Sequence, residues 1–222
     1  MVTIVPAGMC PGHFDVKPKD AQALSDASLL LKQGFEQFVD DLIKSTGNKK
    51  LIVETVDVKG SWMVPETQIK ATERICSILC RMFPKWKEDF QSNAEVYEKS
   101  IMTVALHHKK ESEAKHLGAQ YVVCNEYQKP FLEWLGFNVV ATYGRETELT
   151  PKKIAEVIEK ARSFQAKIVV DNLQSGPEAG KAIVSAIDGV HVTLTNFPLE
   201  GSYIGSLNDN VQKLLRAVEL SF

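Results

Sequence analysis

The sequence feature that most constrains the fold is a long stretch without a helix breaker. Neither glycine nor proline occurs between Pro84 and Gly118. Apolar side chains recur there at helical spacing, at Phe90, Ala94, Tyr97, Ile101, Val104 and Ala105. At 1.5 Å per residue, about thirty residues would span roughly 45 Å, more than the width of one small lobe. The stretch therefore predicts a linking helix over residues 85–117, between an N-terminal lobe of residues 1–84 and a C-terminal lobe of residues 118–222.

Strand and helix patterns alternate on both sides of this stretch. Short β-rich runs are followed by amphipathic segments, and we expect strands at residues 2–5, 28–31, 51–56, 120–124, 138–142, 167–171 and 191–195. Thr150 followed by Pro151 is typical of a capped helix start. Alternation of this kind predicts an α/β fold of two small lobes, each a mainly parallel sheet with flanking helices.

Composition excludes several classes of function. The 222 residues carry a net charge of −2, without the clustered lysine and arginine that nucleic-acid binding needs. No run approaches the roughly 18 apolar residues of a membrane span. The motifs G-x-S-x-G, G-x-x-x-x-G-K-[ST] and C-x-x-C are absent, so we expect no enzyme. Because a predicted strand follows Met1 directly, we also expect the signal segment to be absent from this chain.

The first predicted loop carries groups that can coordinate a metal. It follows the expected strand at residues 2–5 and contains Cys10, His13 and Asp15, ahead of the helix start at Pro18. In open α/β sheets ligands bind beyond the carboxyl ends of strands. Thiolate, imidazole and carboxylate groups are all transition-metal ligands.

Several segments resemble one known family. The opening is similar to the pattern V-P-x-G-x-D-P-H-x-Y-E-P-x-P-S-D, with matches at Val5, Pro6, Gly8, Pro11, Pro18 and Asp20. Later motifs of the same family fall on residues 84–97, 122–131, 147–154 and 203–210. The chain thus resembles the periplasmic zinc- and manganese-binding solute-binding proteins of ABC importers, without the first strand-helix unit of that family.

This resemblance implies a function and a location. A family member is an extracytoplasmic receptor that captures a transition-metal ion between its lobes and presents it to the membrane permease of an ABC importer. We expect a monomer whose partners are that permease and a metal ion or small solute. The metal would be transported cargo, such as zinc, and would have no catalytic role.

The metal-ligand positions that the resemblance implies are largely replaced. They fall on Gly12, Gly60, Asn125 and Asn196. Neighbouring side chains could stand in, and the predicted ligands are His13, Glu126, Asp171 and Cys10. A cysteine ligand would favour zinc, copper or iron over manganese. The expected ligand cleft is lined by Gly12, Phe14, Gly60, Ser61, Trp62, Cys124, Asn125, Ser175 and Asn196.

Two alternatives remain open from the sequence. Glycine at two ligand positions leaves room for a larger metal complex or an organic solute, with Phe14, Trp62 and Tyr127 as stacking surfaces. A non-transport protein of similar fold is the other alternative.

Three further interpretations concern residues outside the predicted site. Adjacent positions on a helix point about 100° apart, so we expect His107 and His108 to lie on a solvated face without sharing a metal. Asp20 is interpreted as a helix cap. Cys124 is also compatible with an ordinary buried strand residue.

Overall fold

A computed structural model of the chain describes residues 2–6, 9, 14–199 and 202–221. The elements before the long helix are α1 (Pro18–Ser25), β1 (Leu29–Lys32), α2 (Phe38–Thr46), β2 (Ile52–Thr55), α3 (Pro65–Met82) and the short 3-10 helix η2 (Pro84–Trp86). The long helix is α4 (Lys87–Ala114). It is followed by η3 (Leu117–Ala119), β3 (Tyr121–Asn125), η4 (Glu126–Gln128), α5 (Lys129–Leu135), β4 (Asn138–Tyr143), η5 (Glu146–Glu148), α6 (Pro151–Ser163), β5 (Ile168–Asn172), α7 (Lys181–Ile187), β6 (Val190–Leu194) and α8 (Tyr203–Leu220).

The elements after α4, which we call the C-terminal half, form a three-layered α/β unit. Their strands pair in the order β4-β3-β5-β6, and every pairing is parallel. Successive residues of a strand point to opposite faces. Val122 and Cys124 pack with α5 and α8, whereas Val123 packs with α6 and α7 on the other face. The predicted parallel α/β fold is confirmed.

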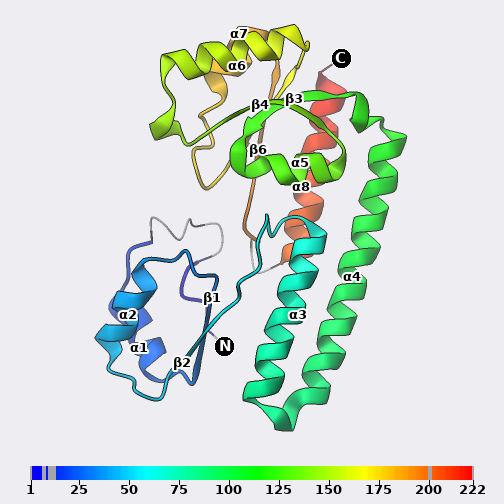
Figure 1. Ribbon diagram of the computed structural model, residues 1–222. Coiled ribbons are helices and arrows are strands. Elements are labelled where there is room, and N and C mark those ends of the chain that lie inside the picture. The colour runs from blue at the N-terminus through cyan, green and yellow to red at the C-terminus, as the bar shows by residue number, and fades with distance from the viewer. Residues whose placement is uncertain (1, 7–8, 10–13, 200–201, 222) are drawn as a thin grey trace.

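The elements before α4, which we call the N-terminal half, are smaller. Strands β1 and β2 pair in parallel, with α1 and α2 on one side of the pair and α3 on the other (Figure 1). Val56, Ala71 and Ile78 form the buried centre of the layer between β2 and α3. The backbone N–H of Lys17 donates to the Asp20 carboxylate at 2.8 Å, which confirms Asp20 as a helix cap. The strand expected at residues 2–5 is wrong, because those residues take no part in a described sheet.

The predicted long helix is confirmed as the continuous 28-residue α4. It runs antiparallel to α3 and continues alongside the C-terminal half, where it lies next to α8 (Figure 1). Its stripe of apolar residues contacts both halves, and Ile101 is completely buried in the largest core. Lys109 Nζ and Ser112 Oγ donate to the backbone carbonyls of Trp134 and Leu135 at the end of α5. The exact lobe boundaries at residues 84 and 118 stay predictions.

A second connection between the halves lies at the start of α3. The Met63 side chain is completely buried in the core of the C-terminal half. The Tyr203 hydroxyl donates to the Met63 carbonyl at 3.0 Å, and Trp134 Nε1 donates to Glu66 Oε1 at 3.3 Å. The loop before α3 is therefore fixed to α5 and α8. Among the described helices, none has the length and apolar character needed to span a membrane.

The packing of α4 predicts a large difference between two adjacent alanine substitutions. Ile101→Ala should lower the free energy of unfolding by about 2–5 kcal/mol, because it opens a cavity in the main core. Met102→Ala, at a side chain that is 59% exposed, should change it by less than about 0.5 kcal/mol. Urea denaturation measures both values. Equal effects of the two substitutions would contradict the placement of α4.

Candidate functional site

Polar side chains gather where three parallel strands of the C-terminal half end. Strand β3 ends at Asn125, β5 ends at Asn172, and Thr195 follows β6. Because the strands are parallel, their carboxyl ends meet at the same edge of the sheet. All three side chains are buried. This edge is where an open α/β sheet places its ligand.

The Asn125 side chain is hydrogen-bonded to the backbone of nearby loops. Its Oδ1 accepts from the Tyr127 backbone N–H at 3.1 Å, and its Nδ2 donates to the Gly144 carbonyl at 3.0 Å. The side chain thereby caps η4 and ties it to the end of β4. Both polar atoms of the Asn125 side chain are therefore used in hydrogen bonds to the backbone.

A chain of amides then crosses the sheet edge. Gln128 Nε2 donates to Asn172 Oδ1 at 3.1 Å and to the Leu194 carbonyl at 3.3 Å. Asn172 Nδ2 donates in turn to Ser175 Oγ at 2.8 Å. Gln128 is completely buried, so these bonds hold η4 against the ends of β5 and β6.

The end of β6 is held in the same way. The Thr195 backbone N–H donates to Asn210 Oδ1 at 3.1 Å, and Asn210 Nδ2 donates to the Thr195 carbonyl at 2.9 Å. Gln174 Nε2 donates to Thr195 Oγ1, and Gln174 Oε1 accepts from the Asn196 backbone N–H. We call the linked polar residues the amide network, which consists of Gln128, Asn172, Gln174, Ser175, Thr195, Asn196 and Asn210.

Two oxygens of the amide network lack a hydrogen-bond donor within the described part of the chain. They are Gln128 Oε1 and Asn196 Oδ1, and both are buried. A buried acceptor without a donor costs about 1–3 kcal/mol. A ligand N–H or O–H group that reached these oxygens would recover that free energy.

Asp171 faces away from this edge. One residue before Asn172 on β5, it points to the opposite face of the sheet, and its carboxylate is completely buried. It accepts from the Tyr143 hydroxyl at 2.6 Å, from His191 Nε2 at 2.6 Å, and from the Gly180 backbone N–H at 2.9 and 3.1 Å. Burial, and then the Asp171 charge, raise the pKa of Tyr143, so its hydroxyl stays a donor. Both carboxylate oxygens of Asp171 thus already accept hydrogen bonds inside the fold, which argues against its expected role as a metal ligand.

Cys124 is also unsuited to metal binding in this fold. The side chain is completely buried in the core on the α5 and α8 side of the sheet. Burial, and to a lesser degree Glu133, raise the pKa of its thiol far above the ordinary value. A metal ligand must be the thiolate. Cys124 is therefore a core residue, in agreement with its interpretation from the sequence as a buried strand residue.

Two of the predicted ligands, Asp171 and Glu126, lie in the described part of the chain. Asp171 is buried, whereas Glu126 is exposed. Glu126 lies in η4, directly after β3. A Cβ atom placed on Gly144 would lie 2.7 Å from Glu148 Oε2 and 3.8 Å from Glu126 Oε1, so both carboxylates border the Gly144 backbone. Negative charge thus lies at the rim of the strand-end edge, beside the neutral amide network.

The cleft residues predicted in the N-terminal half are mostly used by local packing. The Phe14 ring packs on Phe38 with centroids 5.0 Å apart, and Trp62 packs on the core under α3 and donates Nε1–H to the Val58 carbonyl. Gly60 has φ of +107°, a conformation that favours glycine, and Ser61 is half-buried. Of the three aromatic residues expected to stack on a solute, Tyr127 has an exposed ring, 5.9 Å from the Arg145 guanidinium. The predicted residues Cys10, Gly12 and His13 lie outside the described residues.

Comparison with known proteins identifies the family. The sequence matches the family described as zinc-uptake complex component A, periplasmic, over residues 1–217. The chain belongs to this family. The resemblance found in the sequence is therefore confirmed, and the chain is a solute-binding protein of the zinc-uptake component A family. No curated protein matches it.

Solved structures with the same fold are metal-binding proteins of low sequence identity. One is the Mn-bound periplasmic metal binding protein from Candidatus Liberibacter asiaticus, at 18% identity and a TM-score of 0.81, covering 97% of this chain and 90% of the other. The Cd-bound form of a periplasmic metal binding protein from the same organism has 18% identity, a TM-score of 0.82 and coverage of 97% and 89%. FpvC of P. aeruginosa in complex with Ni²⁺ has 15% identity, a TM-score of 0.76 and coverage of 98% and 87%.

Within this family fold, the described residues at the expected ligand positions are neutral. Gly60 has no side chain, Asn125 caps its own loop, and Asn196 belongs to the amide network. Ser175 and Asn196 of the amide network are among the predicted cleft residues, whereas Gln128, Asn172, Gln174, Thr195 and Asn210 were missed from the sequence. Asn172 and Asn196 directly follow predicted strands.

The enclosure of Asp171 predicts a loss of stability when its charge is removed. In Asp171→Asn, the new NH₂ group would face the donors of Tyr143, His191 and Gly180, and the free energy of unfolding should fall by on the order of 3 kcal/mol. The matched control is Asp188→Asn, at an exposed residue with φ of +50° that asparagine tolerates. Thermal or urea unfolding measures both. A stable Asp171→Asn protein that had lost metal binding would instead indicate a ligand role.

Proposed function

We propose that this protein is the extracytoplasmic solute-binding component of an ABC importer, and that its cargo is a transition metal already held by a small organic ligand. The cargo would bind at the edge formed by the amide network and be presented to a membrane permease. The observation that carries the proposal is that this sheet edge is built from neutral amides, including Asn125 and Asn196 at two expected ligand positions.

The argument rests on what a bare divalent ion requires. A protein that removes water from such an ion must supply several donors, usually imidazole, thiolate or carboxylate groups. Asp171 and Cys124 are enclosed in the fold, which leaves Glu126 as the exposed predicted ligand among the described residues. A metal complex brings its own donors and needs from the protein only shape and hydrogen bonds. Movement of the loops that cover Gln128 Oε1 and Asn196 Oδ1 would open these oxygens as acceptors for its N–H or O–H groups.

The role in transport is inferred from the family and the shape of the chain. The family description names a periplasmic component of a zinc-uptake complex, which supports an extracytoplasmic location and a permease partner. The helix α4 is packed against both halves, so large rotation of one half would break its contacts. We therefore infer capture by loop movement, in a protein that acts as a monomer and performs no catalysis.

A second candidate is direct capture of a transition-metal ion such as zinc by His13, Cys10 and Glu126. The exposure of Glu126 favours it, together with the nearby Glu148 carboxylate. The two candidates differ in what His13 does. It is essential for direct capture and dispensable for binding a saturated complex.

Calorimetric titration separates these candidates. The probes are the neutral nickel–histidine complex, Ni²⁺ alone and Zn²⁺ alone, each added to the wild type and to His13→Ala. We expect the complex to bind equally to both proteins. Asn196→Ala should weaken its binding about tenfold, the equivalent of one hydrogen bond of about 1.4 kcal/mol.

The matched control is Asn138→Ala, at the opposite end of the sheet, which should leave binding unchanged. Loss in His13→Ala of one Zn²⁺ or Ni²⁺ equivalent that the wild type binds, with no binding of the complex, would show that the cargo is the bare ion.

A further inference from the structure

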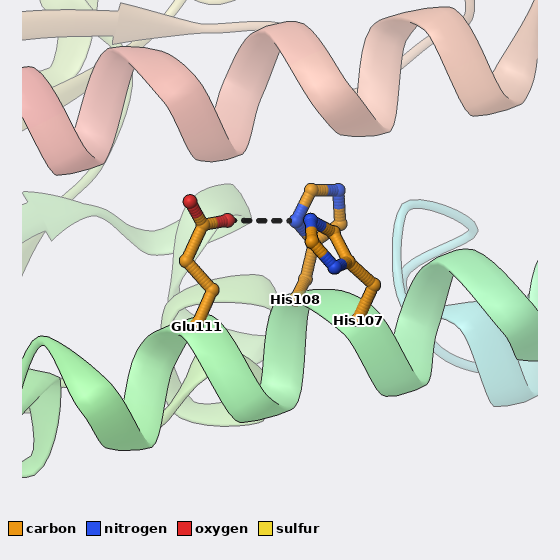
Figure 2. A group of neighbouring side chains, drawn as sticks. All are labelled: His107, His108 and Glu111. Carbon is orange, nitrogen blue, oxygen red and sulfur yellow. Dashed lines mark hydrogen bonds and ion pairs between the residues drawn. The ribbon is translucent and has the colours of Figure 1, made fainter.

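A cluster of metal-ligating side chains lies on α4, outside the amide network. It consists of His107, His108 and Glu111, whose ligand atoms all lie within 4.8 Å of one another. Figure 2 shows the two imidazole rings and the carboxylate on the same side of α4, turned toward α8. Glu111 is four residues after His107 and three after His108, and both spacings bring helix side chains together.

His108 is enclosed, in contrast to its neighbour. The expectation of a solvated face is wrong for His108, which is 3% exposed, whereas His107 is exposed. The reason is the position of α8, whose Asn208 Oδ1 lies 2.7 Å from His108 Nε2. The sequence pattern of α4 alone contains no information on this contact.

The hydrogen bonds of His108 leave one nitrogen facing a carboxylate. Asn208 Oδ1 is an acceptor, so Nε2 must carry the hydrogen in that bond. In the neutral ring Nδ1 then has a lone pair, and this atom lies 3.3 Å from Glu111 Oε2. A metal ion placed between these two atoms would satisfy both acceptors.

We propose that His107, His108 and Glu111 form a binding site for a divalent transition-metal ion of the zinc type. His108 Nδ1, a Glu111 carboxylate oxygen and a ring nitrogen of His107 supply three ligands, and water completes the fourth position. Two imidazoles and one carboxylate suit zinc, nickel or copper better than magnesium or calcium. Asn208 fixes the His108 ring through the nitrogen that does not bind the metal, the usual arrangement around metal-binding histidines.

The observed spacing fits such an ion. With metal–ligand bonds of about 2.0–2.1 Å, two ligands of a tetrahedral zinc lie about 3.4 Å apart. The 3.3 Å between His108 Nδ1 and Glu111 Oε2 has this value already. The ligand atoms of all three residues lie within 4.8 Å of one another. Rotation of the exposed His107 ring would bring its nitrogen closer to the other two ligands.

The helix site is separate from the proposed cargo site. Asn208 holds His108, whereas Asn210 holds Thr195 of the amide network. The two asparagines point about 200° apart around α8, because a helix turns about 100° per residue. A metal bound here would stabilise the folded state, because only in that state does Asn208 of α8 hold the His108 ring in place for binding.

Equilibrium dialysis with Zn²⁺ alone tests the site. The protein carries Cys10→Ser, His13→Ala, Cys76→Ser and Cys80→Ser, so that the other thiols and the loop histidine cannot bind the probe. We expect one zinc per chain at pH 7.5 and a higher unfolding temperature with zinc. His107→Ala and Glu111→Gln should each weaken binding at least tenfold and remove the thermal shift, and Asn208→Ala should weaken binding about tenfold.

The control variant is His116→Asn, which removes a histidine at the end of α4 whose φ of +53° asparagine accepts. It should bind zinc like its parent. Less than stoichiometric zinc in the parent, or full binding that persists in both His107→Ala and Glu111→Gln, would overturn the proposal.

Discussion

The structure depends on the packing of α4 against both halves of the chain. Its first part lies along α3, which covers β1 and β2, and its second part contacts α5 and α8. Buried groups hold it in place, including Ile101 in the main core and Ser112, which donates to the Leu135 carbonyl. Met63 adds a second connection, because its side chain enters the core of the C-terminal half. The relative position of the two halves is thereby set by packing in the folded state.

On this scaffold, strand alternation decides which polar groups can meet a ligand. Asp171 and Asn172 are adjacent on β5, yet one is enclosed by Tyr143, His191 and Gly180 and the other joins the amide network. The charged member of the pair is thus used for stability, and the neutral member lies at the edge where ligands bind. This separation leaves neutral side chains at the described sheet edge of this chain, although the chain belongs to a metal-binding family. It is the physical basis of our proposal that the metal arrives with its own ligands.

Much of the fold could be predicted because its signals are local. The helix at α4 follows from the lack of glycine and proline, and the start of α6 follows from Thr150, whose hydroxyl accepts from the Lys153 backbone N–H. The strand expected at residues 2–5 failed because β-rich composition does not supply a pairing partner. The site was harder to predict, since it depends on which face of a strand each residue occupies. The same holds for His108, whose burial is decided by α8, one hundred residues later in the chain.

The central claim is that the cargo metal does not bond to side chains of the amide network or its rim. Anomalous diffraction at the nickel edge, from crystals grown with the nickel–histidine complex, locates the ion directly. We predict a peak beyond the carboxyl ends of β3, β5 and β6, with every protein side chain farther away than a bond of about 2.0–2.2 Å. A peak within that bonding distance of Glu126, His13 or Asn196 would contradict the account.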